Sequence, residues 1–217
     1  RGLEPTFGSG ALTATQIPNN IYGYTGTVAV GTPVRYLFDD KSRVPAMTYS
    51  QLQFIKAEAA FKKGDRETAL TAYRNGIASH IDFVNARNRD NNQTPTQITT
   101  EEKNAFLANP TIVPTSANLT LSQIMEQKYI AQWGWGALEQ WMDLRRYHYT
   151  DADPATGQQV FGGFVIPVNL YPDNANKPVY RIRPRYNSEY IWNRESLDKV
   201  GGLALDYHTK EMWITQP

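Results

Sequence analysis

The segment that most constrains this chain is Tyr129–Arg146, which reads YIAQWGWGALEQWMDLRR. Apolar residues recur in it at spacings of three and four, which is typical of one face of an α-helix: Ile130, Trp133, Ala137, Trp141 and Leu144. We therefore expect one long helix that begins after the capping residue Thr120 and carries these tryptophans into a core. Gly134 and Gly136 each weaken such a helix by about 1 kcal/mol relative to alanine. We expect that a neighbouring element closely approaches the backbone there.

Capping signals predict further helices on both sides of this segment. The spacing Thr48–Gln51 predicts a helix start, and Lys62–Gly64 predicts its end. Asp65 is a suitable N-cap for the next helix. Because so short a turn separates the two helices, we expect them to be antiparallel. Two more starts are predicted, one at Thr99–Glu102 for a short helix and one at Ser188 for a helix through about Leu197.

Composition excludes several functional classes. The chain has 217 residues, a net charge of +1 and no basic run, so the electrostatic footprint of a nucleic-acid-binding protein is missing. No stretch approaches the ~20 apolar residues of a membrane span. Cysteine is absent, and His80, His148 and His208 are scattered, so we expect neither a zinc site nor another cofactor. The chain begins at Arg1, from which we expect it to be part of a longer precursor.

The distribution of helical patterns and of loop-forming residues predicts one mostly α-helical domain over residues 1–217, with long loops and minor β-structure. Residues 1–45 are rich in glycine, proline and threonine and are expected to be loops. Residues 46–149 carry the helical patterns. Residues 150–217 are expected to form loops and one short helix.

Several motifs together resemble the C-terminal portion of the SusD/RagB family, from about Tyr22 onward. They occur in the family's order: Met47–Ala60, Tyr73–Ile77, Ile124–Ala131, Glu139–Arg146 and the block from Arg181 to Asn193. Gly64–Ala69, with Tyr73 one turn later, is also similar to the middle of a tetratricopeptide repeat. The resemblance implies tetratricopeptide-type helix pairs. The family's lipidated cysteine and most of its N-terminal half are not in this chain, and the tail after Asn193 is longer than the family pattern.

The resemblance implies a non-catalytic protein that captures oligosaccharides at the cell surface. Such a protein would be lipid-anchored to the outer membrane in its full precursor. Its implied partner is a SusC-like TonB-dependent transporter, which would take the oligosaccharide inward. Two other classes remain open from the residues alone, namely a helical-repeat interaction scaffold and a glycoside hydrolase.

Glycan contacts are expected from loop aromatics, because a sugar ring packs its C–H face on an aromatic plane while amides and carboxylates bind its hydroxyls. The N-terminal loop supplies both kinds of group: Asn20, Tyr22, Tyr24, Tyr36, Phe38 and Asp39. The same residues could instead be strand residues that hold the loop on the helical body. No family motif transfers a binding residue onto this chain.

Several charged residues admit a catalytic and a structural interpretation. Glu101 and Glu102 could be glycosidase carboxylates, but acids in a helix's first turn are better explained by its dipole. Asp151 and Asp153 could be catalytic acids, calcium ligands or solvated loop residues. Asp143, Arg145 and Arg146 could suggest an anion or sugar site, but we favour an ion pair between Asp143 and Arg146, which are three apart on one helix.

Overall fold

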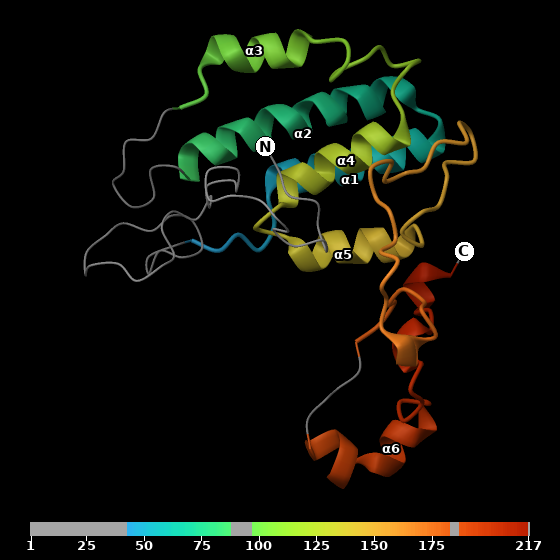
Figure 1. Ribbon diagram of the computed structural model, residues 1–217. Helices are drawn as coiled ribbons and strands as arrows, with labels where there is room; N and C mark the ends of the chain where they lie inside the picture. The colour runs from blue at the N-terminus through green and yellow to red at the C-terminus, as the bar shows by residue number, and fades with distance from the viewer. Residues whose placement is uncertain (1–42, 88–96, 183–186, 217) are drawn as a thin grey trace, which may run out of the picture. The chain divides into compact units, whose positions relative to one another are not determined.

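A computed structural model describes residues 43–87, 97–182 and 187–216, and these are mostly helical (Figure 1). The α-helices are α1 (Tyr49–Lys63), α2 (Arg66–Arg87), α3 (Thr100–Ala108), α4 (Leu121–Gln132), α5 (Ala137–Arg146) and α6 (Arg194–Lys199). Short helical turns are η2 (Pro172–Asn174), η3 (Ser188–Trp192), η4 (Tyr207–Thr209) and η5 (Trp213–Thr215). The predicted mostly helical class is confirmed. In the described ranges the predicted minor β-structure is limited to an isolated bridge between Ala152 and Gln159.

The chain divides into two compact units, Arg1–Ala137 and Leu138–Pro217. The first contains the helices α1 to α4, and the second contains nearly all of α5 together with α6 and the short turns. The single domain over 1–217, with its three predicted segments, stays a prediction.

The helix pair α1–α2 is set by the local signals that the sequence carries. The Thr48 hydroxyl accepts a hydrogen bond from the Gln51 amide at 3.1 Å and caps α1. Gly64 ends α1 in the left-handed conformation, at φ 86°. One residue later, the Asp65 carboxylate accepts from the Thr68 amide at 3.1 Å and opens α2. The two helices pack side by side (Figure 1), as the short connection predicts.

The core of the first unit lies between α1, α2 and α4. Phe54 is fully buried on α1, and its ring meets the Tyr73 ring of α2 edge-on at 6.2 Å. Gly76 allows this approach, because a Cβ there would lie 2.8 Å from the Phe54 ring. The Tyr73 hydroxyl donates to the Ile112 carbonyl at 2.7 Å. Ile124 and Met125 on α4 complete the buried layer.

The helix α3 is the short helix that the sequence predicts. Its capping box forms as expected, with the Thr99 hydroxyl on the Glu102 amide and the Glu102 carboxylate on the Thr99 amide. Arg74 of α2 donates to the Leu107 carbonyl at 3.2 Å, and Lys103 pairs with Asp82 at 2.7 Å. These bonds hold α3 on α2.

The prediction of one long helix through Tyr129–Arg146 is wrong. Thr120 caps α4 with a full capping box, as predicted, but α4 ends at Gln132 and a turn precedes α5. Gly134 lies in that turn at φ 78°, a conformation that glycine adopts without a steric penalty. The predicted close approach of another element is therefore not needed to explain this glycine. Trp133 is 51% exposed rather than in the core, while Trp135 meets the Phe83 ring edge-on at 5.3 Å.

Replacing Gly134 with alanine distinguishes the broken helix from a continuous one, because the two predict changes of opposite sign in the free energy of unfolding. In a turn at positive φ the substitution is expected to lower the free energy of unfolding by about 1–2 kcal/mol. In an uninterrupted helix the same change would raise it by about 1 kcal/mol. Urea denaturation measures the difference. The control is Gly163→Ala, because a Cβ at Gly163 meets nothing within 4 Å and its φ is not positive.

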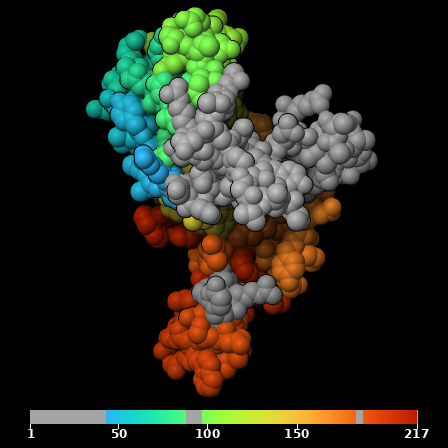
Figure 2. Space-filling model, turned by 90° about the vertical axis from the view of Figure 1, so that its left-hand side faces the viewer, coloured from blue at the N-terminus to red at the C-terminus, as the bar shows by residue number. Residues whose placement is uncertain are grey.

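The second unit differs from its prediction near residue 188. The structure has a π-helical turn, η3, and then α6, with a break at Asn193, where we expected one helix capped by Ser188. Neither start carries a side-chain cap. The predicted end at Val200–Gly202 is confirmed, with Gly201 at φ 71°. Figure 2 shows an orange-red group of side chains that includes those of η3 and α6. Ile191 and Trp192 of η3 are exposed.

Candidate functional site in the second unit

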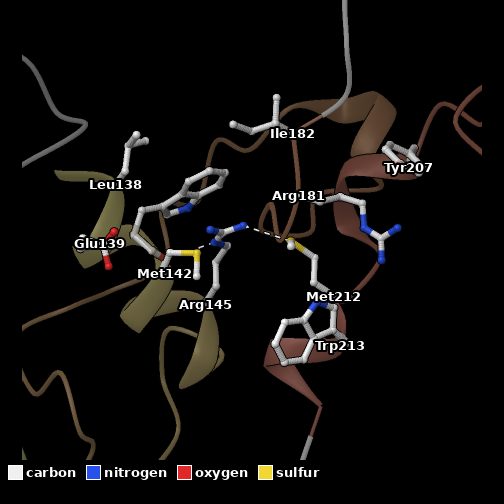
Figure 3. A pocket seen from close by; sticks show the side chains of 10 residues that line it. Leu138, Glu139, Met142, Arg145, Arg181, Ile182, Tyr207, Met212 and Trp213 are labelled. Atoms are coloured by element: carbon white, nitrogen blue, oxygen red, sulfur yellow. Dashed lines mark hydrogen bonds between the residues drawn. The ribbon is translucent and has the colours of Figure 1, made fainter. Parts of the chain in front are cut away.

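A cavity of about 600 Å³ opens in the second unit. One side of it is α5, and the other side is made by the chain around residues 181–182 and by the C-terminal turns η4 and η5 (Figure 3). Its lining combines indoles, thioethers and charged groups: Leu138, Glu139, Trp141, Met142, Arg145, Arg181, Ile182, Tyr207, Met212 and Trp213. Flat apolar surface with a few polar groups is the usual make-up of a small-molecule site.

Arg145 is the central polar group of this cavity. The side chain is only 5% exposed and stacks on the Trp141 indole, with 3.8 Å from the guanidinium carbon to the ring centroid. Its Nε donates to the Trp141 carbonyl at 3.2 Å, and its Nη1 donates to the Tyr180 carbonyl at 2.7 Å. Nη1 also donates to the Met212 Sδ at 3.3 Å (Figure 3). Arg145 thereby ties α5 to two segments that are distant in the sequence.

Trp141 is held in place from its other end. Its indole N–H donates to the Tyr149 hydroxyl at 3.0 Å, and that hydroxyl donates to the Val179 carbonyl. The Tyr149 ring stacks on Phe164 at 5.6 Å and meets Tyr180 edge-on at 5.6 Å. Burial raises the pKa of Tyr149, so its hydroxyl stays protonated and can donate this bond. The indole wall of the cavity is therefore fixed before any ligand arrives.

Trp213 provides the open wall. Its side chain is 82% exposed, while the backbone of η5 is fastened beneath it. The Met212 amide donates to the Thr215 hydroxyl at 3.1 Å, and the Thr215 amide donates to the Met212 carbonyl at 2.9 Å. Arg181 braces the neighbouring chain through its bonds to the carbonyls of Lys210 and Glu211. These hydrogen bonds hold the backbone that bears the exposed indole.

The structural interpretations of several charged residues are confirmed. Arg146 pairs with Asp143 at 2.8 Å, and neither residue lines the cavity, whereas Arg145 of the same cluster does. Glu101 and Glu102 lie in the first turn of α3. The Asp153 carboxylate accepts from the Ala155 amide and the Thr156 hydroxyl, which makes it a turn residue. In the described parts of the chain, no three of His, Asp and Glu are grouped so that they could hold a metal ion.

His148 gives the second unit a pH-dependent contact. Its Nδ1 lies 2.7 Å from the Asp151 carboxylate, and its Nε2 lies 3.6 Å from the Glu211 carboxylate. The hydrogen bond to Asp151 and the two charges raise the pKa of His148 above 6.5, against a smaller effect of burial. Because the folded pKa is the higher one, the contact stabilises fully below the unfolded pKa and is lost as pH rises through the folded pKa.

The variant His148→Asn tests this contact, since asparagine tolerates the left-handed φ of 42° at this position. The loss of stability relative to the parent should be largest near about pH 5.5 and should shrink toward about pH 8. Urea denaturation across this range measures it. A loss that is constant, or that grows with pH, would contradict the assignment.

The predicted glycan contacts, Asn20, Tyr22, Tyr24, Tyr36, Phe38 and Asp39, lie outside the described residues. They stay a prediction. Sequence reasoning missed the cavity itself, because its two sides are brought together by bonds that span 35 and 67 residues from Arg145. The available signal was a tryptophan placed beside a methionine, Met212–Trp213, in a tail without periodic pattern.

Comparison with known proteins identifies the family. The model of a SusD-like family, described as starch-binding and associating with the outer membrane, matches residues 13–172, about three quarters of the 217 residues. The chain belongs to this SusD-like family. A search of curated proteins and a search of solved structures each returned no match. The α5 side of the cavity lies inside the matched segment, whereas Arg181, Tyr207 and Trp213 lie beyond it.

Membership settles the class of activity. Proteins of this family bind glycans without catalysis, so the protein is a non-catalytic glycan-binding protein with a role at the outer membrane. This excludes the glycoside hydrolase that composition left open. Of the helices in the described ranges, none has the length and apolarity needed to cross a bilayer.

Proposed function

We propose that the protein captures oligosaccharides at the cell surface, lipid-anchored in its full precursor, and passes them to a SusC-like TonB-dependent transporter. Family membership supports the glycan and the outer membrane. The loop aromatics Tyr22, Tyr24, Tyr36 and Phe38, with Asn20 and Asp39, are proposed as further contacts on the same glycan. Transfer to the transporter extends the family role by one step.

We propose that the glycan binds in the cavity of the second unit, on the basis of one observation. The cavity offers a fixed indole, Trp141, and an exposed indole, Trp213, around a buried guanidinium. A sugar ring has a C–H face that packs on an indole and hydroxyls that accept from a guanidinium. The cavity volume of about 600 Å³ is enough for a short oligosaccharide segment rather than a whole chain.

Replacing Trp213 with alanine tests the site. We expect the affinity for the bound oligosaccharide to fall by about tenfold or more, since truncating a tryptophan at the centre of a binding site commonly costs more than 1 kcal/mol. Isothermal titration with maltoheptaose and a panel of plant and algal oligosaccharides measures it. The fold should be unaffected, because the ring is largely exposed.

Trp192→Ala is the matched control. Trp192 is 85% exposed in the same unit and does not line the cavity. Its loss should leave the affinity unchanged. If the parent and Trp213→Ala bound the oligosaccharide with equal affinity, the cavity would not be the glycan site. The loop aromatics would then be the remaining candidates for glycan contacts.

A further inference from the structure

Arg145 lacks a negatively charged partner in the part of the chain that the structure describes. Its described acceptors are two backbone carbonyls and a thioether, all of them neutral, and no described residue accepts from Nη2. No Asp or Glu there forms an ion pair with it. A buried cation without a counter-charge carries a desolvation cost that neutral acceptors offset only in part.

The other charged groups of the cavity leave this cation uncompensated. Arg181 adds a second guanidinium, which is also bound to neutral carbonyls, those of Lys210 and Glu211. Glu139 is the one carboxylate among the lining residues that the structure describes, and it is exposed at the edge of the group drawn in Figure 3. Two cations against one exposed acid make the described lining a site for negative charge.

We propose that the cavity recognises an acidic sugar, one whose ring carries a carboxylate or a sulfate ester. The acidic group would meet the Arg145 Nη2, where a charge-assisted hydrogen bond replaces the missing partner. The sugar ring would pack between the indoles of Trp141 and Trp213. This inference rests on the proposed function and names the class of glycan for it.

Half of the residues that we propose for recognition lie outside the segment that matches the family. Arg145 and Trp141 lie within residues 13–172, while Trp213 and Arg181 lie beyond them. The C-terminal tail thus completes the cavity around the arginine. Each side of the cavity supplies one cation and one indole, so both sides would contribute to charge recognition and to ring stacking.

The test compares sugars with and without their charged groups, using the full chain. The first pair is tetragalacturonate and its fully methyl-esterified form, and the second is a κ-carrageenan tetrasaccharide and its desulfated form. We expect the charged member of at least one pair to bind about tenfold more tightly than its neutral partner. Raising the salt concentration to about 0.5 M should reduce that preference, because it screens the charges. The pair that responds identifies the carboxylate or the sulfate as the recognised group.

Two variants and one control test the role of charge in the cavity. Glu139→Gln removes the exposed acid and should strengthen binding of the charged sugar about two- to fivefold, more than that of its neutral partner. Glu101→Gln, an exposed first-turn acid on α3 outside the cavity, should change neither affinity. Arg145→Lys keeps the charge but loses the planar fork, so the preference for the charged sugar should fall even where circular dichroism shows an intact fold.

The outcomes separate the inference from the proposed function. Equal affinity for charged and neutral members, or binding of neutral maltoheptaose alone, would overturn the inference and leave glycan capture standing. An effect of Glu139→Gln no larger than that of Glu101→Gln would also overturn it. Failure of every tested sugar to bind would overturn both.

Discussion

Replacing Phe54 with alanine should lower the free energy of unfolding by about 3–5 kcal/mol, the usual cost of deleting a buried aromatic ring. Phe54 is fully buried on α1, and its ring is closed in by Tyr73 and by the backbone of Gly76. Rigid helix backbone at Gly76 cannot collapse into the space that the ring leaves. Urea denaturation followed by far-ultraviolet circular dichroism reports this loss, because α1 and α2 carry much of the helix in the described residues.

Phe106→Ala is the matched control for that substitution. Phe106 lies on α3 with 40% of its surface exposed, so the same chemical change should cost far less. If both variants lost similar stability, the assignment of the core to the α1–α2 contact would be wrong.

Replacing Tyr149 with alanine should destabilise the second unit by about 3–5 kcal/mol. The ring stacks on Phe164 and meets Tyr180, and its hydroxyl joins the Trp141 indole to the Val179 carbonyl. Near-ultraviolet circular dichroism and tryptophan fluorescence measure the change, because Trp141 loses its hydrogen-bond partner. Glycan affinity should fall as well, since the indole wall of the cavity is no longer fixed.

Tyr149→Phe separates the hydroxyl from the ring. It keeps the aromatic contacts and leaves the indole N–H and the Val179 carbonyl without a partner, so we expect a loss of about 1–3 kcal/mol. A conservative variant that costs as much as Tyr149→Ala would show that the hydroxyl, not the ring packing, stabilises this region. A negligible cost for both would contradict the described network.

The parts of the fold that depend on neighbours in the chain could be predicted from the sequence. Thr48, Thr99 and Thr120 each cap a helix through a residue three positions later. Gly64 and Asp65 end one helix and begin the next in the same local way. Such contacts are encoded in a few adjacent residues, which is why their positions were correct.

The break between α4 and α5 was missed because its pattern is ambiguous. Ile130, Trp133 and Ala137 keep a helical spacing across the turn, and glycine is compatible with both a weakened helix and a positive φ. In the structure Ile130 and Trp133 are both about half exposed, so the apparent apolar stripe does not mark a buried face. Periodicity records spacing but not the direction in which the chain turns.

The cavity could not be predicted because its chemistry depends on distant segments. In the sequence, Asp143, Arg145 and Arg146 admit an anion or sugar site, but an ion pair within the helix is the favoured interpretation. Arg145 resembles any basic residue in the last turn of a helix. Only the positions of Tyr180 and Met212 show that Arg145 is buried against neutral acceptors. The sequence-based site at residues 20–39 draws on composition, and it stays a prediction beside the cavity.

The most direct measurement is the response of the tryptophan indole N–H signals to a bound oligosaccharide by nuclear magnetic resonance. The chain has five tryptophans, each assignable by single replacement. We predict that Trp213 and Trp141 shift in a saturable manner with the sugar concentration, while Trp192 stays in place. Binding that shifts neither Trp213 nor Trp141 would contradict the cavity as the glycan site.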